Sequence, residues 1–123
     1  MYEIKVKANF SSAHNLRNYH GKCEHLHGHN WVVEAVFVYA KLDKDGMAID
    51  FHDAKALLRG VLEKLDHSYL NELEDFKKTN PTSENIAKII FDTIRNSCPE
   101  IASIAVWENE NSCATYRGAS GKR

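Results

Sequence analysis

A chain of 123 residues is long enough to bury its own hydrophobic core, and we expect one domain over residues 1–123. Its 43% hydrophobic and 27% charged residues are ordinary for a globular protein in water. The formal net charge of -1 excludes a general electrostatic attraction to nucleic acid or to a membrane surface, so we expect neither as a partner. An anionic ligand would need a local group of cations.

The number of cysteines and the lengths of the apolar stretches indicate the cellular compartment of the protein. Cys23, Cys98 and Cys113 are an odd number of cysteines at irregular spacing, which is not the pattern of a disulfide framework. The first ten residues lack the apolar segment of a signal peptide, and no apolar run approaches the roughly 20 residues that cross a bilayer. We therefore expect a cytoplasmic protein with free thiols, in which Cys98 and Cys113 are small buried side chains.

Two strands are expected in the first third of the chain. Apolar and charged residues alternate over residues 2–7, which predicts a half-buried strand that continues toward His14. Residues 31–42 are rich in Val, Phe and Tyr and predict a long second strand, with Asp-Lys-Asp-Gly at 43–46 as its turn.

Two helices are expected next. Over residues 53–65 the apolar residues recur at helical spacing, and the acidic stretch 50–53 can cap the start of this helix. A second helix follows a loop, with Thr82 or Ser83 as its cap, and it ends before Pro99.

The chain closes with a predicted hairpin, in which residues 101–107 and 113–117 flank the turn 109–112. The order β-β-α-α-β-β predicts an α+β fold, a four-stranded antiparallel sheet with two helices on one face. Residues 32–39 place apolar side chains on both faces of the second strand. We therefore expect another surface to cover the face of the sheet that has no helices.

Histidines gather in the stretch 23–29, Cys-Glu-His-Leu-His-Gly-His. His27 and His29 are two residues apart, so on an extended backbone their side chains leave by the same face. Such a pair suits Zn²⁺, and one further protein ligand would leave a catalytic zinc with an open position. Spacing leaves two candidates for the third ligand: His14, from the neighbouring strand, and His25.

Four more side chains are candidates for acid–base chemistry. Cys23 is either a zinc ligand or a free thiol that a nearby metal activates. Glu24 is either an acid–base group or a solvated charge. Asp66 and His67 follow the first helix, whose C-terminal end favours a charged imidazole, although a histidine at a helix end is more often structural.

Glu108 shares a strand face with Ile104 and Val106, so its carboxylate points the same way as core residues. A carboxylate in that position needs partners. It either pairs with a cation of the protein or binds a ligand with two parallel N–H donors, such as the edge of a guanidine-like ring.

Several motifs together identify a family. They are Phe10-Ser-Ser-Ala-His14, Cys23-x3-His27-Gly-His29, Leu65-Asp-His67, Asn80-Pro-Thr-Ser-Glu84-Asn85, and Val106-x-Glu108 followed by Tyr116-Arg-Gly118. They resemble the 6-pyruvoyl-tetrahydropterin synthase and 6-carboxytetrahydropterin synthase family of tunnelling folds over nearly the whole chain. The resemblance implies that zinc is held by His14, His27 and His29, which decides against His25.

The resemblance also implies the other roles. Cys23 would be the catalytic thiol, with Asp66 and His67 as its partners in proton transfer. Glu108 would bind the 2-amino group and ring N–H of a pterin, assisted by Thr82 or Ser83. The family's substrate is 7,8-dihydroneopterin triphosphate, whose side-chain hydroxyls would meet the zinc. The assembly would be a homo-hexamer, two stacked trimers that close their sheets into barrels, with active sites at subunit boundaries.

The branches of this family form different products. The bacterial branch releases triphosphate and acetaldehyde and forms 6-carboxy-5,6,7,8-tetrahydropterin for queuosine and other 7-deazaguanines, whereas the animal branch forms 6-pyruvoyl-tetrahydropterin. Three residues between Cys23 and His27 resemble the carboxy-synthase pattern. Glu24-x2-His27 resembles a third subgroup, which cleaves the side chain to 6-hydroxymethyl-7,8-dihydropterin.

The prediction is therefore a zinc-dependent lyase, a 6-carboxytetrahydropterin synthase, with side-chain cleavage by Glu24 left open as a second activity. Two alternatives remain at this point. One is a 6-pyruvoyl-tetrahydropterin synthase. The other is a non-catalytic zinc or pterin-binding module, in which Cys23 would complete a closed shell of four ligands.

Overall fold

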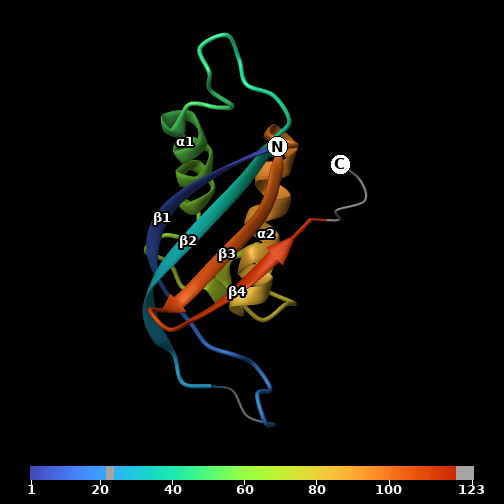
Figure 1. The fold of residues 1–123 in the computed structure, drawn as a ribbon. Helices are drawn as coiled ribbons and strands as arrows, with labels where there is room; N and C mark the ends of the chain where they lie inside the picture. The colour runs from blue at the N-terminus through green and yellow to red at the C-terminus, as the bar shows by residue number, and fades with distance from the viewer. Residues whose placement is uncertain (22–23, 119–123) are drawn as a thin grey trace.

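The computed structural model describes residues 1–21 and 24–118, and the predicted β-β-α-α-β-β order is confirmed. Two single-turn 3₁₀ segments lie between the helices. The elements are β1 (Tyr2–His14), β2 (His27–Tyr39), α1 (Phe51–Leu62), η1 (Leu70–Glu72), η2 (Glu74–Phe76), α2 (Ser83–Ser97), β3 (Ile101–Asn109) and β4 (Ser112–Arg117) (Figure 1).

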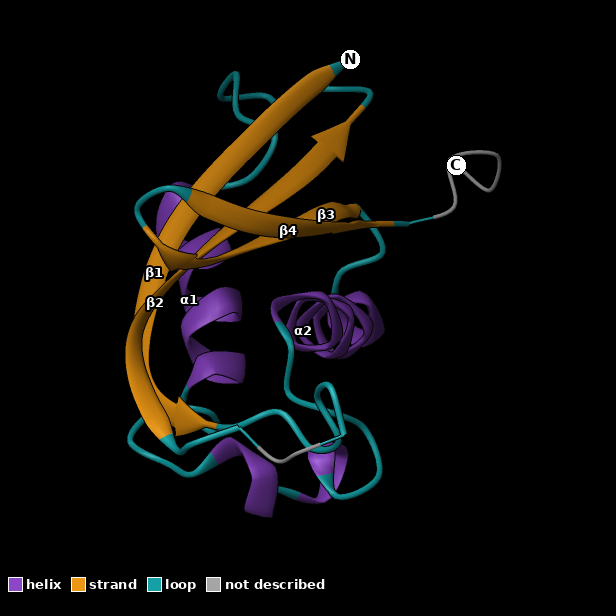
Figure 2. Ribbon diagram, turned by 90° about the horizontal axis from the view of Figure 1, so that it is seen from below, coloured by secondary structure: helices purple, strands orange, loops and turns teal. Residues whose placement is uncertain are grey.

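The strands form one antiparallel sheet in the order β1-β2-β3-β4. β1 and β2 pair along their full length, from Tyr2 opposite Tyr39 to His14 opposite His27. Both helices lie against the same face of the curved sheet, as Figure 2 shows, which confirms the predicted α+β fold. No helix among residues 1–21 and 24–118 is long and apolar enough to cross a membrane.

The core lies between this face of the sheet and the helices. Alternate residues of β2 from Trp31 to Phe37 have no exposed surface, and α1 and α2 cover them with apolar side chains. Cys98 is buried here, as expected, whereas Cys113 is exposed. Our expectation for Cys113 was wrong because it lies on β4, an edge strand, on the face that no helix covers.

Both helices begin at the caps that the sequence indicated. The Asp50 carboxylate accepts the His52 N–H (2.7 Å), and the Thr82 hydroxyl accepts the Asn85 N–H (3.1 Å). These side chains satisfy N–H groups that have no partner within the helix. Of the two proposed caps for α2, Thr82 is the one that the structure uses.

The segment after α1 covers part of the free edge of β1. The His67 N–H donates to the Ser11 carbonyl (2.6 Å), the Ala13 N–H donates to the Ser68 carbonyl (3.0 Å), and the Ser11 N–H donates to Asp66 Oδ1 (2.8 Å). His67 adopts a left-handed backbone conformation there, with φ of 53°. The C-terminal part of β1, which leads to His14, is therefore hydrogen-bonded along both edges, by β2 on one edge and by residues 66–68 on the other.

Candidate active site

Strand pairing brings three histidines together at one end of the sheet. His14 closes β1 directly opposite His27, the first residue of β2, and His29 follows two residues later. One nitrogen from each ring lies within 4.8 Å of the others. The Trp31 ring packs against the His14 imidazole in an edge-to-face arrangement, with ring centroids 4.9 Å apart. His25 is outside this cluster and contributes only its backbone carbonyl.

Backbone carbonyls orient two of the imidazoles. His14 Nδ1 lies 2.8 Å from the Pro81 carbonyl, and His27 Nδ1 lies 2.8 Å from the His25 carbonyl. A carbonyl can only accept, so each Nδ1 donates, and Nε2 is the ring nitrogen of each histidine that remains to face the cluster. The two Nε2 atoms face one another at 3.1 Å. Tetrahedral zinc, with bonds of about 2.0–2.1 Å, holds neighbouring ligand atoms about 3.3 Å apart.

His29 supplies the third nitrogen. Its Nε2 is buried without a hydrogen-bond partner among the described residues, and Glu108 Oε1 lies 3.6 Å away from it. Burial lowers the pKa of His29, the Glu108 carboxylate opposes this shift, and the neighbouring His14 and His27 reinforce it. A neutral imidazole with an unpartnered buried nitrogen is suited to bind a metal, so this donor set fits Zn²⁺.

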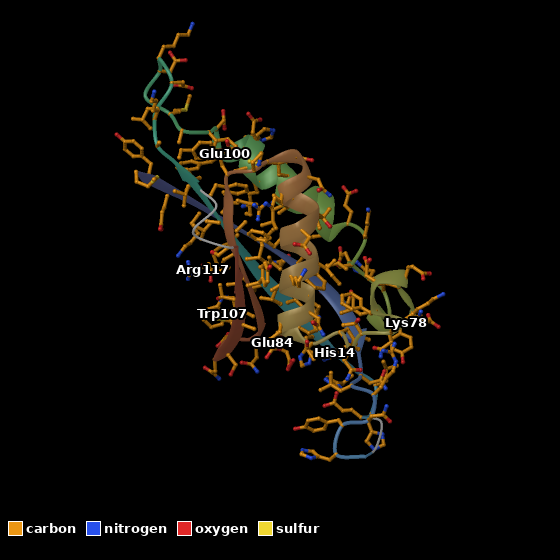
Figure 3. All side chains as sticks on the ribbon, turned by 90° about the vertical axis from the view of Figure 1, so that its right-hand side faces the viewer. His14, Lys78, Glu84, Glu100, Trp107 and Arg117 are labelled. Carbon is orange, nitrogen blue, oxygen red and sulfur yellow. The ribbon has the colours of Figure 1, made fainter. Side chains whose placement is uncertain are left out.

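Glu108 lies between the histidines and two clefts. Its carboxylate is 3.9 Å from His14 Nε2 and 3.6 Å from His29 Nε2, and no Lys or Arg pairs with it among the described residues. A cleft of about 720 Å³ opens on the His29 side. A smaller cleft of about 170 Å³ opens on the side of His14 and His27. Figure 3 shows His14 and Glu84, which line the smaller cleft, at the same end of the molecule as Trp107, which lines the larger one.

Three further predicted site residues line the smaller cleft, beside His14, His27 and Glu108. Glu24, Thr82 and Ser83 line it, and Glu24 Oε1 lies 3.9 Å from His27 Nδ1. The Thr82 hydroxyl already accepts a hydrogen bond as the cap of α2. Cys23, the predicted thiol, lies outside the described residues.

Asp66 and His67 lie elsewhere on the same chain. Asp66 Oδ1 is 3.0 Å from His67 Nδ1, and both residues flank the edge of β1 at Ser11. The N–H of Ser11 is the main cause of the lowered pKa of Asp66, and His67 adds to it. Neither side chain lines the two clefts beside the histidines. Within one chain the structure therefore does not bring this pair to the histidine cluster.

Sequence reasoning missed the groups that hold these residues in place. The Pro81 carbonyl orients His14, and the amide side chains of Asn15, Asn71 and Asn80 bind the backbone near Glu24. The motif that begins at Asn80 was visible, but sequence spacing does not reveal which backbone groups a distant amide will reach.

Comparison with known proteins places the chain in a family. It matches the family model described as 6-pyruvoyl tetrahydropterin synthase over residues 3–119. A relative from Archaeoglobus fulgidus, named putative 6-carboxy-5,6,7,8-tetrahydropterin synthase, is 38% identical over 114 residues, which cover 93% of this chain and 94% of the relative. A relative from Pyrococcus furiosus, named dihydroneopterin monophosphate aldolase, is 36% identical over 108 residues, which cover 85% of this chain and 88% of the relative.

The fold agrees with these matches. The solved structure of Caenorhabditis elegans 6-pyruvoyl tetrahydropterin synthase matches with a TM-score of 0.83 and 25% identity, and the match covers 96% of each chain. The names of these three relatives differ in the reaction that they state. The chain thus belongs to the 6-pyruvoyl tetrahydropterin synthase family of pterin enzymes.

Proposed function

We propose that this protein is a zinc-dependent 6-carboxy-5,6,7,8-tetrahydropterin synthase that acts on 7,8-dihydroneopterin triphosphate and serves 7-deazaguanine synthesis. The observation that carries the proposal is the cluster of three imidazoles, with Glu108 beside it and a ligand-sized cleft next to it. The 38% identical Archaeoglobus relative bears this activity in its name, and the three-residue spacing after Cys23 favours the same branch.

Each residue of the site has a proposed role that follows from its chemistry. The carboxylate of Glu108 can accept the two parallel N–H groups of a pterin edge, and the larger cleft has room for the ring system. Zinc held by the three histidines would supply a Lewis acid for the side-chain hydroxyls. Cys23 and His67 would then move protons to and from the substrate side chain. The triphosphate leaves by elimination. One water then supplies the second carboxylate oxygen on the carbon attached to the ring, while the next C–C bond breaks and the other two carbons leave as acetaldehyde.

A specific observation favours a second activity, cleavage of the side chain to 6-hydroxymethyl-7,8-dihydropterin. Glu24 lines the smaller cleft, with Oε1 3.9 Å from His27 Nδ1, where a carboxylate can exchange protons with a bound substrate. The 36% identical Pyrococcus relative is named an aldolase of a related dihydroneopterin phosphate. Both activities need the same metal centre and differ in the group that moves the proton.

The deciding experiment is to identify the products, by mass spectrometry, after zinc-loaded protein is incubated with 7,8-dihydroneopterin triphosphate. A 6-carboxytetrahydropterin product with acetaldehyde supports the proposal, and 6-pyruvoyl-tetrahydropterin would move the protein to the other branch. Glu24→Gln should reduce hydroxymethylpterin selectively; an equal loss of both products would remove the second activity. A zinc-bound protein that turns over no dihydropterin triphosphate at any pH would indicate a non-catalytic module.

Pterin recognition is tested separately from turnover. Glu108→Ala should weaken pterin binding about 10- to 150-fold, since hydrogen bonds to a charged group are worth about 1.5–3 kcal/mol, while zinc stays bound. Glu110→Ala is the matched control, because Glu110 lines the same cleft but lies in the exposed β3–β4 turn. Titration calorimetry with a dihydropterin gives both affinities. Equal affinities for wild type and Glu108→Ala would place the pterin elsewhere.

A further inference from the structure

Two asparagine side chains bind the backbone of the segment that follows His14. Asn71 Oδ1 accepts the Asn15 N–H (3.0 Å), and Asn71 Nδ2 donates to the Asn15 carbonyl (2.8 Å). Asn80 repeats this arrangement two residues later, because its Oδ1 accepts the Arg17 N–H (2.8 Å) and its Nδ2 donates to the Arg17 carbonyl (3.0 Å). Each amide thus satisfies both backbone groups of one residue, as a neighbouring strand would.

The segment held in this way in turn holds Glu24. The Glu24 N–H donates to the Leu16 carbonyl (2.8 Å), and the Leu16 N–H donates to Glu24 Oε1 (3.1 Å). Asn15 Nδ2 donates to the Glu24 carbonyl (3.1 Å). The hydroxyl of Tyr69 donates to Asn15 Oδ1 (2.7 Å), which fixes the direction of the Asn15 amide. Glu24 is therefore fastened through its N–H, its carbonyl and one carboxylate oxygen.

The two anchoring asparagines lie in or next to helical elements. Asn71 is buried in η1. Asn80 lies just before α2, and its carbonyl accepts the Thr82 N–H (2.9 Å) and Asn85 Nδ2 (2.9 Å). The next residue, Pro81, is the one whose carbonyl orients His14. A histidine of the cluster and the loop that carries Glu24 are therefore both positioned by the same short segment.

We propose that Asn15, Asn71 and Asn80 form an asparagine clamp whose function is to position Glu24 beside His27 in the smaller cleft. An amide suits this task because it offers a donor and an acceptor at once, which a carboxylate cannot do. It also has no titratable proton, so the clamp keeps its geometry while the acid–base groups beside it change charge. The consequence for catalysis rests on the proposed function, whereas the effect on the loop does not.

Asn15→Asp is the main test. It keeps the acceptor for Tyr69 and replaces the NH₂ that faces the Glu24 carbonyl with an oxygen. Loss of that bond should speed exchange of the Glu24 amide hydrogen about 5- to 30-fold, measured by hydrogen–deuterium exchange. Tyr69→Phe, which removes one hydroxyl and keeps the ring, should raise the same rate by a smaller factor, and it serves if Asn15→Asp does not fold. The matched control is Asn96→Asp, the same change at an exposed position at the far end of α2.

Enzyme kinetics then show whether the clamp positions Glu24 for catalysis or only stabilises the loop. In Asn15→Asp, zinc content and KM should match wild type, whereas kcat and the fraction of hydroxymethylpterin should both fall. Unchanged amide exchange in both variants would overturn the clamp. Faster exchange with an unchanged kcat and product ratio would overturn its positioning role. If wild-type protein turns over no dihydropterin, the proposed function fails, and amide exchange still decides whether the clamp holds the loop.

Discussion

At the scale of single residues, His25 and His27 differ in what their side chains contact. The His27 imidazole faces His14 Nε2, whereas His25 offers only its backbone carbonyl to the cluster. His27→Ala should therefore lose the bound zinc and all activity, while His25→Ala should keep about one zinc per chain. Atomic absorption after dialysis measures the metal, and circular dichroism checks that both variants are folded. Zinc retained in His27→Ala would contradict the assignment.

The Asp66 carboxylate predicts how the stability of the protein changes at acidic pH. Its folded pKa is lower than the ordinary value of 3.8, mainly because the Ser11 N–H donates to it. The folded state therefore binds fewer protons at Asp66, so the stabilisation is present above pH 3.8 and is lost as pH falls through the lower folded pKa. Wild type should lose more stability than Asp66→Asn between about pH 5 and about pH 3, measured by urea unfolding of metal-free protein. Equal losses would contradict the contact.

The site was predictable from the sequence only in part. The shared direction of His27 and His29 follows from residue parity in a strand and needs no structure. The choice between His14 and His25 does not follow from parity, because it depends on β1 pairing with β2 so that His14 faces His27. Glu108 was expected to point the same way as Ile104 and Val106, whereas its closeness to the histidines depends on how β2 and β3 pair.

At the scale of elements, the capping residues of both helices were predictable because capping chemistry is local, although α1 begins at Phe51 and not at residue 53. Other boundaries were less predictable. β2 begins at His27, four residues before the predicted start at 31, because β1 continues to His14 and offers a partner. α1 ends at Leu62, not at 65, although Leu65 is buried as its spacing suggested. The Leu65 carbonyl accepts the Ser12 hydroxyl instead of continuing the helix. Such long-range contacts decide where an element stops.

Replacing Gly118 or Gly60 with alanine should change the stability of the protein in opposite directions. A Cβ on Gly118, just after β4, would lie 2.6 Å from Phe91 Cζ, and the Phe91 ring is buried, so Gly118→Ala should cost about 1–3 kcal/mol of stability. Gly60, in α1, has open space around its Cβ position, so Gly60→Ala should stabilise by about 0.5–1 kcal/mol. Thermal unfolding of the two variants checks the signs. A neutral Gly118→Ala would show that Phe91 can move.

At the scale of the whole molecule, the sheet leaves one face and two edge strands for a partner. The face without helices combines half-exposed Val32 and Val36 with polar groups, among which the Trp107 Nε1–H donates to Glu34 Oε1 (2.5 Å). Residues 66–69 cover only the end of the outer edge of β1, so the outer edges of residues 2–10 and of β4 have no neighbouring strand within the described chain. Edges of this kind are commonly paired or covered in a native assembly.

We propose a hexamer of two stacked trimers, in which Asp66 and His67 of one chain reach the histidine cluster of its neighbour. Mixing inactive Cys23→Ala and His67→Ala proteins under conditions of subunit exchange should then restore part of the activity, because some sites regain both intact groups. Mixing Cys23→Ala with His27→Ala is the control: both changes fall in the same part of one chain, so activity should not return. Light scattering measures the assembly. A fully active monomer would rule out this arrangement.

His67 occupies a backbone conformation that suits glycine better than histidine. With φ of 53° and a side chain that is 82% exposed, its imidazole adds strain without adding packing. His67→Gly should therefore raise the free energy of unfolding by up to about 1 kcal/mol, because the contact of the exposed imidazole with Asp66 contributes little. The same variant should lose turnover if His67 transfers protons. Stability and activity would then oppose one another at this position, and a screen for thermostable variants would select proteins that no longer work.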